Sequence, residues 1–275
     1  MKALREYQPI LSKILQRLAK ETRFQSTPPL GEILEANPRL VVAFNHSSPL
    51  SWLPAISLLT SHVCARGGGG RRPMGVMDKF FFSVPGFRTI AQQLTQSEHA
   101  LGFEELVEKF KSSEGTDIVI FPEGSNCFFG DPAKLQPFRS PRFIELAVRT
   151  GTPILVCAHR GSEDWGVALP IPEKAMHTIL GKIDLLPAFA ADFLKDRLKE
   201  TGVFTLPLLP LPMQKFEMRC EVFYPHLKVS DLSKNREECR AQINEEAERV
   251  HAKLESLLKA IDQDLALKRS SVSSS

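Results

Sequence analysis

The sequence has no long uninterrupted hydrophobic segment. Its most apolar stretch, residues 52–59, is far shorter than the roughly 18 residues that a helix needs to span a bilayer. Residues 1–18 mix charged side chains among apolar ones, so they lack the apolar run of a signal peptide. We therefore expect a cytoplasmic protein without a membrane-spanning helix, and peripheral attachment to a membrane stays open.

Cysteine is sparse and the net charge is small. The five cysteines are odd in number, dispersed and mostly in apolar surroundings, which favours reduced thiols in a core over a disulfide framework. The net charge of +3 is too low to indicate a nucleic-acid partner, so any anion binding must be local. With 43% hydrophobic residues in 275, the chain can form one domain with a helical tail.

Several common catalytic signatures are missing as well. No Gly-x-Ser-x-Gly sequence occurs, which argues against a serine hydrolase of the nucleophile-elbow type. The glycine-rich residues 66–73 match neither a P-loop nor a dinucleotide-binding fingerprint. We predict a flexible loop there, with Arg66, Arg71 and Arg72 in solvent and attracted to an anionic bilayer surface or, as the alternative, holding a phosphate.

Segments with the patterns of strands and helices alternate through the middle of the chain. Strands are predicted at residues 39–44, 74–77, 117–121 and 153–158, and helices at 49–59, 103–111 and 141–149. Such alternation is typical of an α/β fold, here a mixed, mostly parallel sheet flanked by helices. Residues 216–223 alternate apolar and charged side chains, which predicts a half-buried edge strand.

Both ends of the chain have helical patterns. Residues 4–19 have the spacing of an amphipathic helix, and the last long segment carries one apolar stripe that packs on the domain or, as the alternative, on a partner helix. The predicted divisions are an N-terminal helical segment at 1–30, an α/β domain at 31–230 with an apolar insertion or lid at 170–212, a C-terminal helix at 231–269 and a disordered tail at 270–275.

Two short polar motifs follow two of the predicted strands. Asn45-His46-Ser47-Ser48 follows residues 40–44, and Phe121-Pro122-Glu123-Gly124-Ser125 follows residues 117–120. Side chains at the carboxyl ends of parallel strands meet at one edge of the sheet, where α/β folds bind ligands. His46 would lie near the start of the next helix, which favours its neutral, basic form, and Glu123 would reach the same edge and orient a substrate hydroxyl.

The ordered set of motifs resembles the glycerolipid acyltransferases of the lysophosphatidic acid acyltransferase superfamily. That family has an Asn-His-x4-Asp motif and a Phe-Pro-Glu-Gly-Thr/Ser motif, which Asn45-His46 and residues 121–125 match. Residues 79–86, 135–140 and 151–154 are similar to three further segments of the family. The resemblance covers about residues 38–225 and implies an acyltransferase-type α/β fold.

The resemblance also implies a reaction. His46 would deprotonate the hydroxyl of a lysophospholipid or related lysolipid, and that hydroxyl would attack the acyl thioester of acyl-CoA or acyl carrier protein. Neither a metal nor a cofactor is implied beyond the acyl donor. The implied partners are these two substrates and a membrane surface, with the protein peripheral on its inner, cytoplasmic face, and acyl carrier protein as an alternative to acyl-CoA.

The implied site departs from the family pattern in three places, one of which is the absence of the expected basic residue from residues 89–101. Ser51 stands where the motif has aspartate, and Asn126 stands where an arginine often follows the glutamate motif. His46 and Glu123 are the predicted catalytic residues, and the predicted substrate-binding residues are Asn45, Ser47, Ser51, Lys79, Gly124, Ser125, Asn126 and Arg139. Taken alone, Ser51 is a residue of the first helical turn.

The Ser51 change leaves two functions open. One is an acyltransferase whose histidine is assisted by another carboxylate, for which Asp78 and Asp131 are candidates. The other is a catalytically impaired relative that binds lipid or acyl thioester without turnover. A carboxylate on the His46 ring would favour the first function, and apolar walls around that ring would favour the second.

Overall fold

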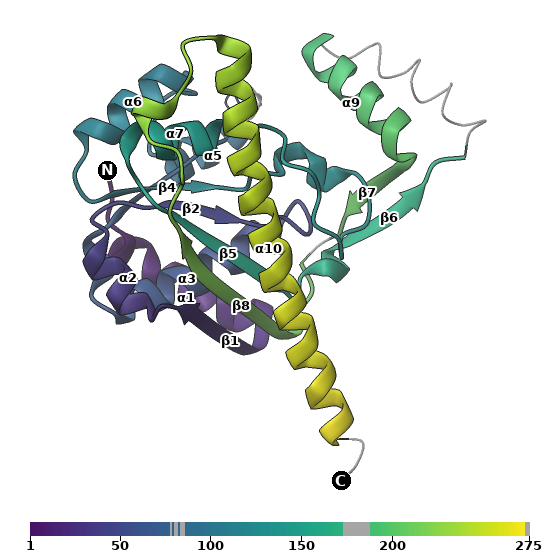
Figure 1. Cartoon of the computed structure of the whole chain (residues 1–275). Helices are drawn as coiled ribbons and strands as arrows, with labels where there is room; N and C mark the ends of the chain where they lie inside the picture. The colour runs from purple at the N-terminus through teal and green to yellow at the C-terminus, as the bar shows by residue number, and fades with distance from the viewer. Residues whose placement is uncertain (78, 80–81, 83–85, 173–187, 209, 273–275) are drawn as a thin grey trace.

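The computed structural model describes residues 1–77, 79, 82, 86–172, 188–208 and 210–272, and its centre is a six-stranded sheet (Figure 1). The strand order is β1-β8-β5-β2-β4-β3, and four of the five neighbouring pairs are parallel, only β5 and β8 being antiparallel. The strands are β1 (Ala19–Thr27), β2 (Val41–Phe44), β3 (Arg72–Gly75), β4 (Thr116–Ile120), β5 (Ile154–Arg160) and β8 (Met213–Phe223). The predicted mixed, mostly parallel α/β sheet is thus confirmed.

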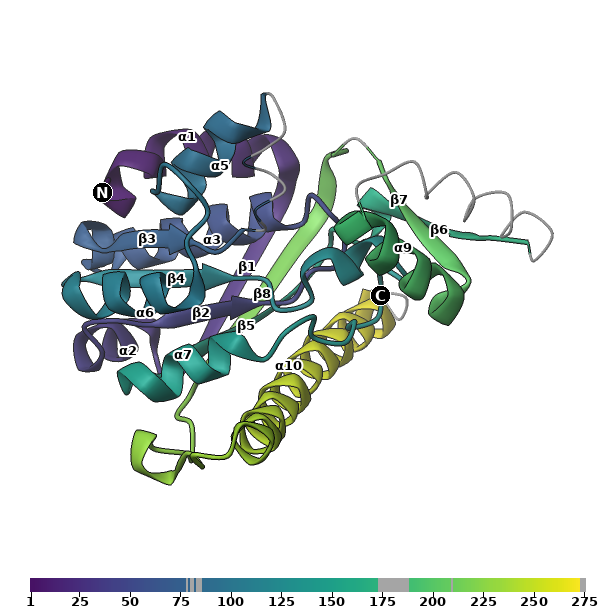
Figure 2. The ribbon, with the colours of Figure 1, turned by 90° about the horizontal axis from the view of Figure 1, so that it is seen from above.

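Helices cover both faces of this sheet (Figure 2). They are α1 (Leu4–Leu18), α2 (Leu30–Ala36), α3 (Trp52–Ala65), α5 (Phe87–Thr95), α6 (Phe103–Ser112), α7 (Arg142–Thr150) and α10 (Arg236–Val272). Successive residues of a strand point to opposite faces. Val41 and Ala43 of β2 therefore pack under α7 and α10, whereas Val42 and Phe44 pack with α1, α2 and α3.

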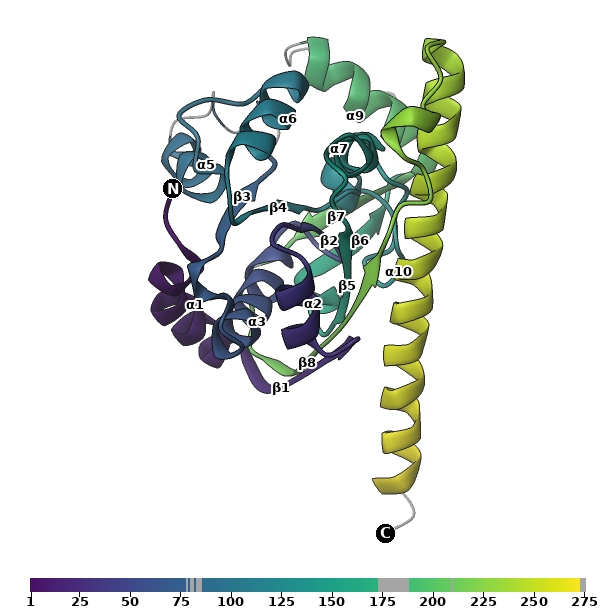
Figure 3. The same cartoon turned by 60° about the vertical axis from the view of Figure 1, so that its left-hand side comes forward.

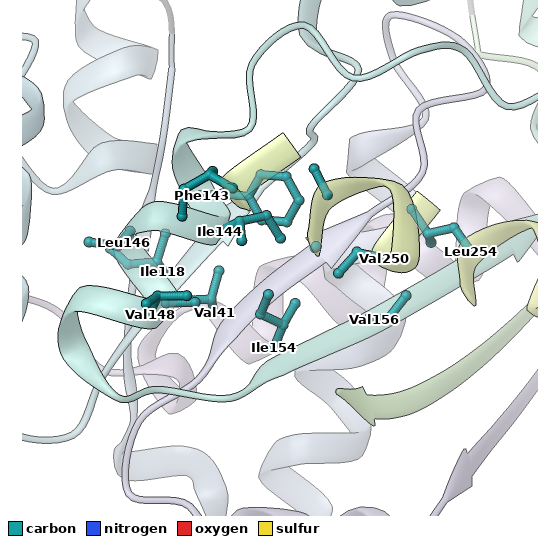
Figure 4. Packing of buried hydrophobic residues seen from close by; sticks show 14 of the residues in the cluster. Val41, Ile118, Phe143, Ile144, Leu146, Val148, Ile154, Val156, Val250 and Leu254 are labelled. Carbon is teal, nitrogen blue, oxygen red and sulfur yellow. The ribbon is translucent and has the colours of Figure 1, made fainter. Parts of the chain in front are cut away.

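Figure 4 shows the first of these two cores, where Phe143 and Ile144 of α7 and Val250 and Leu254 of α10 meet the strands. The predicted stripe of α10 is confirmed, because buried apolar side chains recur along it every three or four residues, from Ile243 to Ile261. Figure 3 shows α10 running along the side of the sheet, so its stripe packs on the domain itself.

Two predictions about the β1 side of the sheet are wrong. Residues 19–27 form an edge strand instead of part of a helical segment, and β8 lies between β1 and β5. The charged side chains of β8 suggested an edge because they alternate with apolar ones. In the structure they are covered by ion pairs, for example Arg219 with Asp264 at 2.6 Å and Glu221 with Lys253 at 2.7 Å, which join β8 to α10.

Local boundaries differ at several other places. The predicted helix at 49–59 is α3, which begins at Trp52, and the predicted strand at 74–77 is β3, which begins at Arg72. Gly68–Gly70 form a 3-10 turn instead of an irregular loop, and Gly68 packs so closely on Val63 that a Cβ there would lie 2.5 Å from a methyl carbon. Helix α10 continues to Val272, so the predicted tail is helical at its start, and residues 273–275 lie outside the described residues.

The predicted insertion at 170–212 is described in part. Strands β6 (Gly166–Pro170) and β7 (Val203–Pro207) pair antiparallel in a second sheet, which we call the β6–β7 arm, and α9 (Ala188–Thr201) precedes β7. In Figures 1 and 2 the arm and α9 lie to one side of the main sheet. Residues 173–187 are outside the described part, and none of the helices in the described part is both long and apolar enough to traverse a bilayer.

Candidate functional site

The two sequence motifs leave the sheet at the same edge. β2 ends at Phe44 and β4 at Ile120, and these parallel neighbours pair with Ala43 opposite Ile120. The loops that follow therefore begin side by side, and the His46 and Phe121 rings lie 4.9 Å apart between centroids. We call this the carboxyl edge of the sheet.

His46 contacts the residue that replaces the aspartate of the family motif. Its Nδ1 lies 2.9 Å from Oγ of Ser51, which is fully buried at the N-cap of α3. The sequence suggested a simple helix residue, but the turn before α3 brings the serine hydroxyl to the imidazole. Burial lowers the pKa of His46 to about 4, and the Ser48 backbone opposes this only in part, so the ring is neutral near pH 7.

Of the two candidate carboxylates, only Asp131 lies in the described structure, and it makes no hydrogen bond or ion pair with the His46 ring there. Asp131 accepts a hydrogen bond from the backbone N–H of Ala133 at 2.9 Å, and Asp78 lies outside the described residues. Within residues 1–77 and the other described ranges, no carboxylate hydrogen-bonds or ion-pairs with the His46 ring. The serine hydroxyl is therefore the ring's polar partner there.

Glu123 links two loops of the site through its carboxyl group. The side chain is 1% exposed, and its Oε1 accepts a hydrogen bond from the backbone N–H of Gln136 at 2.8 Å. Its Oε2 accepts one from the backbone N–H of His46. Burial raises the pKa of Glu123 to about 8, against the opposing effect of the two amides. Both oxygens are thus engaged by backbone, which differs from the predicted contact with a substrate hydroxyl.

A polar surface lies beside the Glu123 carboxyl group and is formed by Gly124, Ser125 and Arg139. Gly124 has φ +52°, a conformation that favours glycine, and a Cβ there would lie 3.4 Å from Cδ of Arg139. The guanidinium of Arg139 donates to Oγ of Ser125 at 2.5 Å, and the Arg139 backbone N–H donates to the carbonyl of Pro122 at 2.9 Å. The exposed charge of Arg139 is therefore held next to the glutamate motif.

The two asparagines brace the loops. The Asn45 side chain accepts from the His159 N–H at 2.7 Å and donates to the His159 carbonyl at 3.3 Å, which extends the β2–β5 pairing by one residue. Asn126 donates to the carbonyl of Pro137 at 2.8 Å. Both side chains are buried. Their amides hold the backbone in place of the substrate contacts that the resemblance implied.

The remaining predicted residues lie at the margins of the site. Ser47 is buried, with its hydroxyl 2.9 Å from that of Ser162, and Lys79 is exposed in a turn beyond β3. Arg71 is remote from solvent and binds Asp117 through two hydrogen bonds of 2.6 and 2.7 Å, so its predicted place in a solvated loop is wrong.

Two polar residues at this edge are not among the residues predicted from the sequence. His159 is the penultimate residue of β5, where its Nε2 donates to the Asn45 carbonyl at 2.9 Å, and Ser162 follows shortly after the strand. The signal was present, because both follow a predicted strand that is parallel to β2. Nine buried side-chain atoms in the described residues have no hydrogen-bond partner, and three of them are here: Ser48 Oγ, Asn126 Oδ1 and His159 Nδ1. Buried polar atoms without a partner are uncommon in native proteins, and a role in binding a ligand is one explanation for them.

The fold and this edge define an α/β protein with a histidine–serine pair, a buried glutamate and an exposed arginine beside it. In the described parts of the chain, no three His, Cys, Asp or Glu residues are grouped so that they could hold a metal ion. A scan against protein-family models gives no match, and searches of curated proteins and of solved structures give none either.

Proposed function

We propose that this protein is an acyltransferase, which moves a fatty acyl group from acyl-CoA or acyl carrier protein to a hydroxyl of a lysophospholipid or related lysolipid. The observation that carries the proposal is the neutral His46, held by Ser51 beside the Glu123–Ser125 loop at the carboxyl edge. The motif resemblance points to the same residues. The proposed setting is the inner, cytoplasmic surface of a membrane, where the protein is peripheral.

In the proposed reaction, the acceptor O–H gives its proton to Nε2 of His46 while its oxygen attacks the thioester carbonyl carbon. The C–S bond then breaks, and the thiolate takes up the proton from the imidazolium. In the tautomer that this reaction requires, Nδ1–H donates to the Ser51 hydroxyl, which can act as acceptor, and Nε2 is left as the base. A neutral hydroxyl stabilises the imidazolium less than a carboxylate would, so we expect modest turnover.

Glu123 takes part in this reaction as a positioning residue. Its carboxyl group holds the backbone of His46 on one side and of Gln136 on the other, which orients the base relative to the loop that carries Arg139. Arg139 is the exposed cation of the site, and a guanidinium can bind phosphate through two hydrogen bonds. We assign it to the polar head of the acceptor.

One observation favours a second function, binding without turnover. The pKa of about 4 makes His46 a weak base, and within the described residues its ring has a serine partner in place of a carboxylate. The same edge would then hold a lipid or acyl thioester and release it unchanged.

The deciding experiment is acyl transfer from acyl-CoA and from acyl carrier protein to a panel of lysophospholipids and lyso-aminolipids. His46→Ala should reduce turnover about 10² to 10⁴-fold, the range of a positioned base. His99→Ala, an exposed histidine elsewhere, is the matched control and should leave turnover unchanged. Activity that is indifferent to His46→Ala would contradict the proposal, and saturable binding without any product would establish the second function.

A further inference from the structure

The β6–β7 arm has one exposed face made of aliphatic side chains. Val167 lies directly opposite Leu206, and Leu169 lies opposite Phe204, and residues that face each other across an antiparallel pair point to the same side. Val167, Leu169 and Leu206 are 38%, 43% and 43% exposed, which is high for large apolar residues that lie together.

The other face of the arm packs on the candidate site. Thr205 is buried, and its hydroxyl donates to the carbonyl of Gly130 at 2.7 Å. A Cβ on Gly166 would lie 3.4 Å from Cβ of Ser48 and 3.2 Å from Pro132. The arm is thus attached to the loops that hold His46 and Glu123. The Phe204 ring, which lies on the same side of the arm as Leu169 and Leu206, also stacks on Phe128 at 6.5 Å between ring centroids and meets Phe129 edge-on at 6.1 Å.

The chemistry of this face suits hydrocarbon better than a protein surface. No charged residue occurs at 166–172 or 203–213, and the exposed face offers no Arg, Tyr or Trp, the residues that anchor protein interfaces. The segment that follows Gly130 is basic, because three exposed cations, Lys134, Arg139 and Arg142, occur with a single acid, Asp131, between residues 131 and 142. Anionic headgroups would complement that charge.

We propose that the aliphatic face of the β6–β7 arm rests on a lipid bilayer, with the basic segment 131–142 against anionic headgroups. The inference deepens the proposed function and rests on it in one respect: a lysolipid acceptor resides in the bilayer, and this contact brings it to the His46 edge. The contact itself requires no turnover, so binding and catalysis can be tested separately.

The test is co-sedimentation of the whole protein with vesicles of phosphatidylcholine, with and without phosphatidylglycerol. Val167→Glu with Leu206→Glu places two carboxylates on the aliphatic face. The matched control, Val229→Glu with Tyr224→Glu, adds the same charge at two exposed apolar residues elsewhere. We expect the arm variant to bind phosphatidylglycerol vesicles at least about tenfold more weakly than the control and the native protein.

Equal vesicle binding by the arm variant and the control would overturn the proposal, as would absence of binding by the native protein. A native dimer that dissociates in the arm variant, without vesicle binding, would assign the face to a second copy of the chain instead. Turnover of a short-chain, monomeric acceptor distinguishes the two proposals. The arm variant should retain it, and if no protein shows turnover while the vesicle result holds, only the enzyme function fails.

Discussion

Strands β2 and β4 carry buried polar groups at both ends, and the two ends differ in kind. Near their amino ends, Asp117 binds Arg71 through two hydrogen bonds and also accepts the backbone N–H of Leu40 at 2.9 Å. At their carboxyl ends, His46 and Glu123 contact a hydroxyl and backbone amides. The amino ends therefore have a buried ion pair, whereas the contacts at the carboxyl ends are mostly neutral hydrogen bonds.

This difference indicates that the amino ends of the two strands have a structural role and that their carboxyl ends have a chemical one. Burial raises the pKa of Asp117 even beside Arg71, so the pair has a large desolvation penalty and depends on both partners being present. In the described part of the chain, the carboxyl edge contains three buried polar atoms without partners, Ser48 Oγ, Asn126 Oδ1 and His159 Nδ1, whereas the amino ends have one, Thr116 Oγ1. Departures of this kind from local satisfaction are expected at functional sites. The following predictions test this contrast, beginning with the largest effect.

Removing the charge of Asp117 should have the largest effect on stability. Asp117→Asn leaves the Arg71 charge buried without a counterion, so we expect a loss of about 3–5 kcal/mol in the free energy of unfolding, measured by urea denaturation. Arg197→Gln is the matched control, since it breaks an ion pair of the same 2.6 Å length whose side chains are 23% and 64% exposed, against 10% and 8% for Arg71 and Asp117. Equal effects of the two variants would contradict the contrast between the ends.

The substitution Glu123→Gln should have the second-largest effect on the free energy of unfolding. The amide nitrogen would face one of the two backbone N–H donors, which costs up to about 3 kcal/mol. Since the folded-state pKa of Glu123 is raised to about 8, the native protein's advantage is complete below pH 4.5 and is lost as the pH rises through 8. Urea unfolding at a series of pH values should therefore show that the difference in free energy of unfolding between native protein and variant narrows as the pH rises, and a constant difference would contradict this prediction.

His159 should make the protein less stable in acid. Burial lowers its pKa from 6.5 to about 3, so on acidification the unfolded chain binds a proton before the folded one does. His159→Gln keeps a donor near the position of Nε2 and does not titrate. Between about pH 7 and 5 the native protein should lose about 2 kcal/mol more than this variant. If the free energy of unfolding depended on pH in the same way for both proteins, the prediction would be wrong.

Ser51 should have the smallest effect, on turnover rather than on stability. Ser51→Ala removes one hydrogen bond to His46, which predicts about fivefold lower turnover. Ser51→Asp restores the charge of the family motif and should raise both the pKa of His46, followed by NMR titration of the ring, and the acyl-transfer rate. An unchanged His46 pKa in Ser51→Asp would show that residue 51 does not act on the ring.

Much of the sheet and the convergence of the two motifs could be predicted from local patterns. Apolar runs such as residues 41–44 and 118–120 mark buried strands, and parallel strands place their following loops at one edge. The place of β8 could not be predicted, because charged residues covered by a helix have the same alternation as charged residues in solvent. The contact of the Asn45 side chain with the His159 backbone could not be predicted either, because the two residues are 114 positions apart in the sequence.

The sequence by itself determined the α/β class, the apolar stripe of α10 and the pairing of His46 with the Glu123 loop at one edge, because each of these follows from local periodicity or from strand ends. Only the tertiary structure decided that Arg71 is buried against Asp117, that Glu123 binds backbone and that Ser51 is the polar partner of His46. These contacts depend on which side chains are buried against each other in the folded chain, and local sequence patterns do not contain that information.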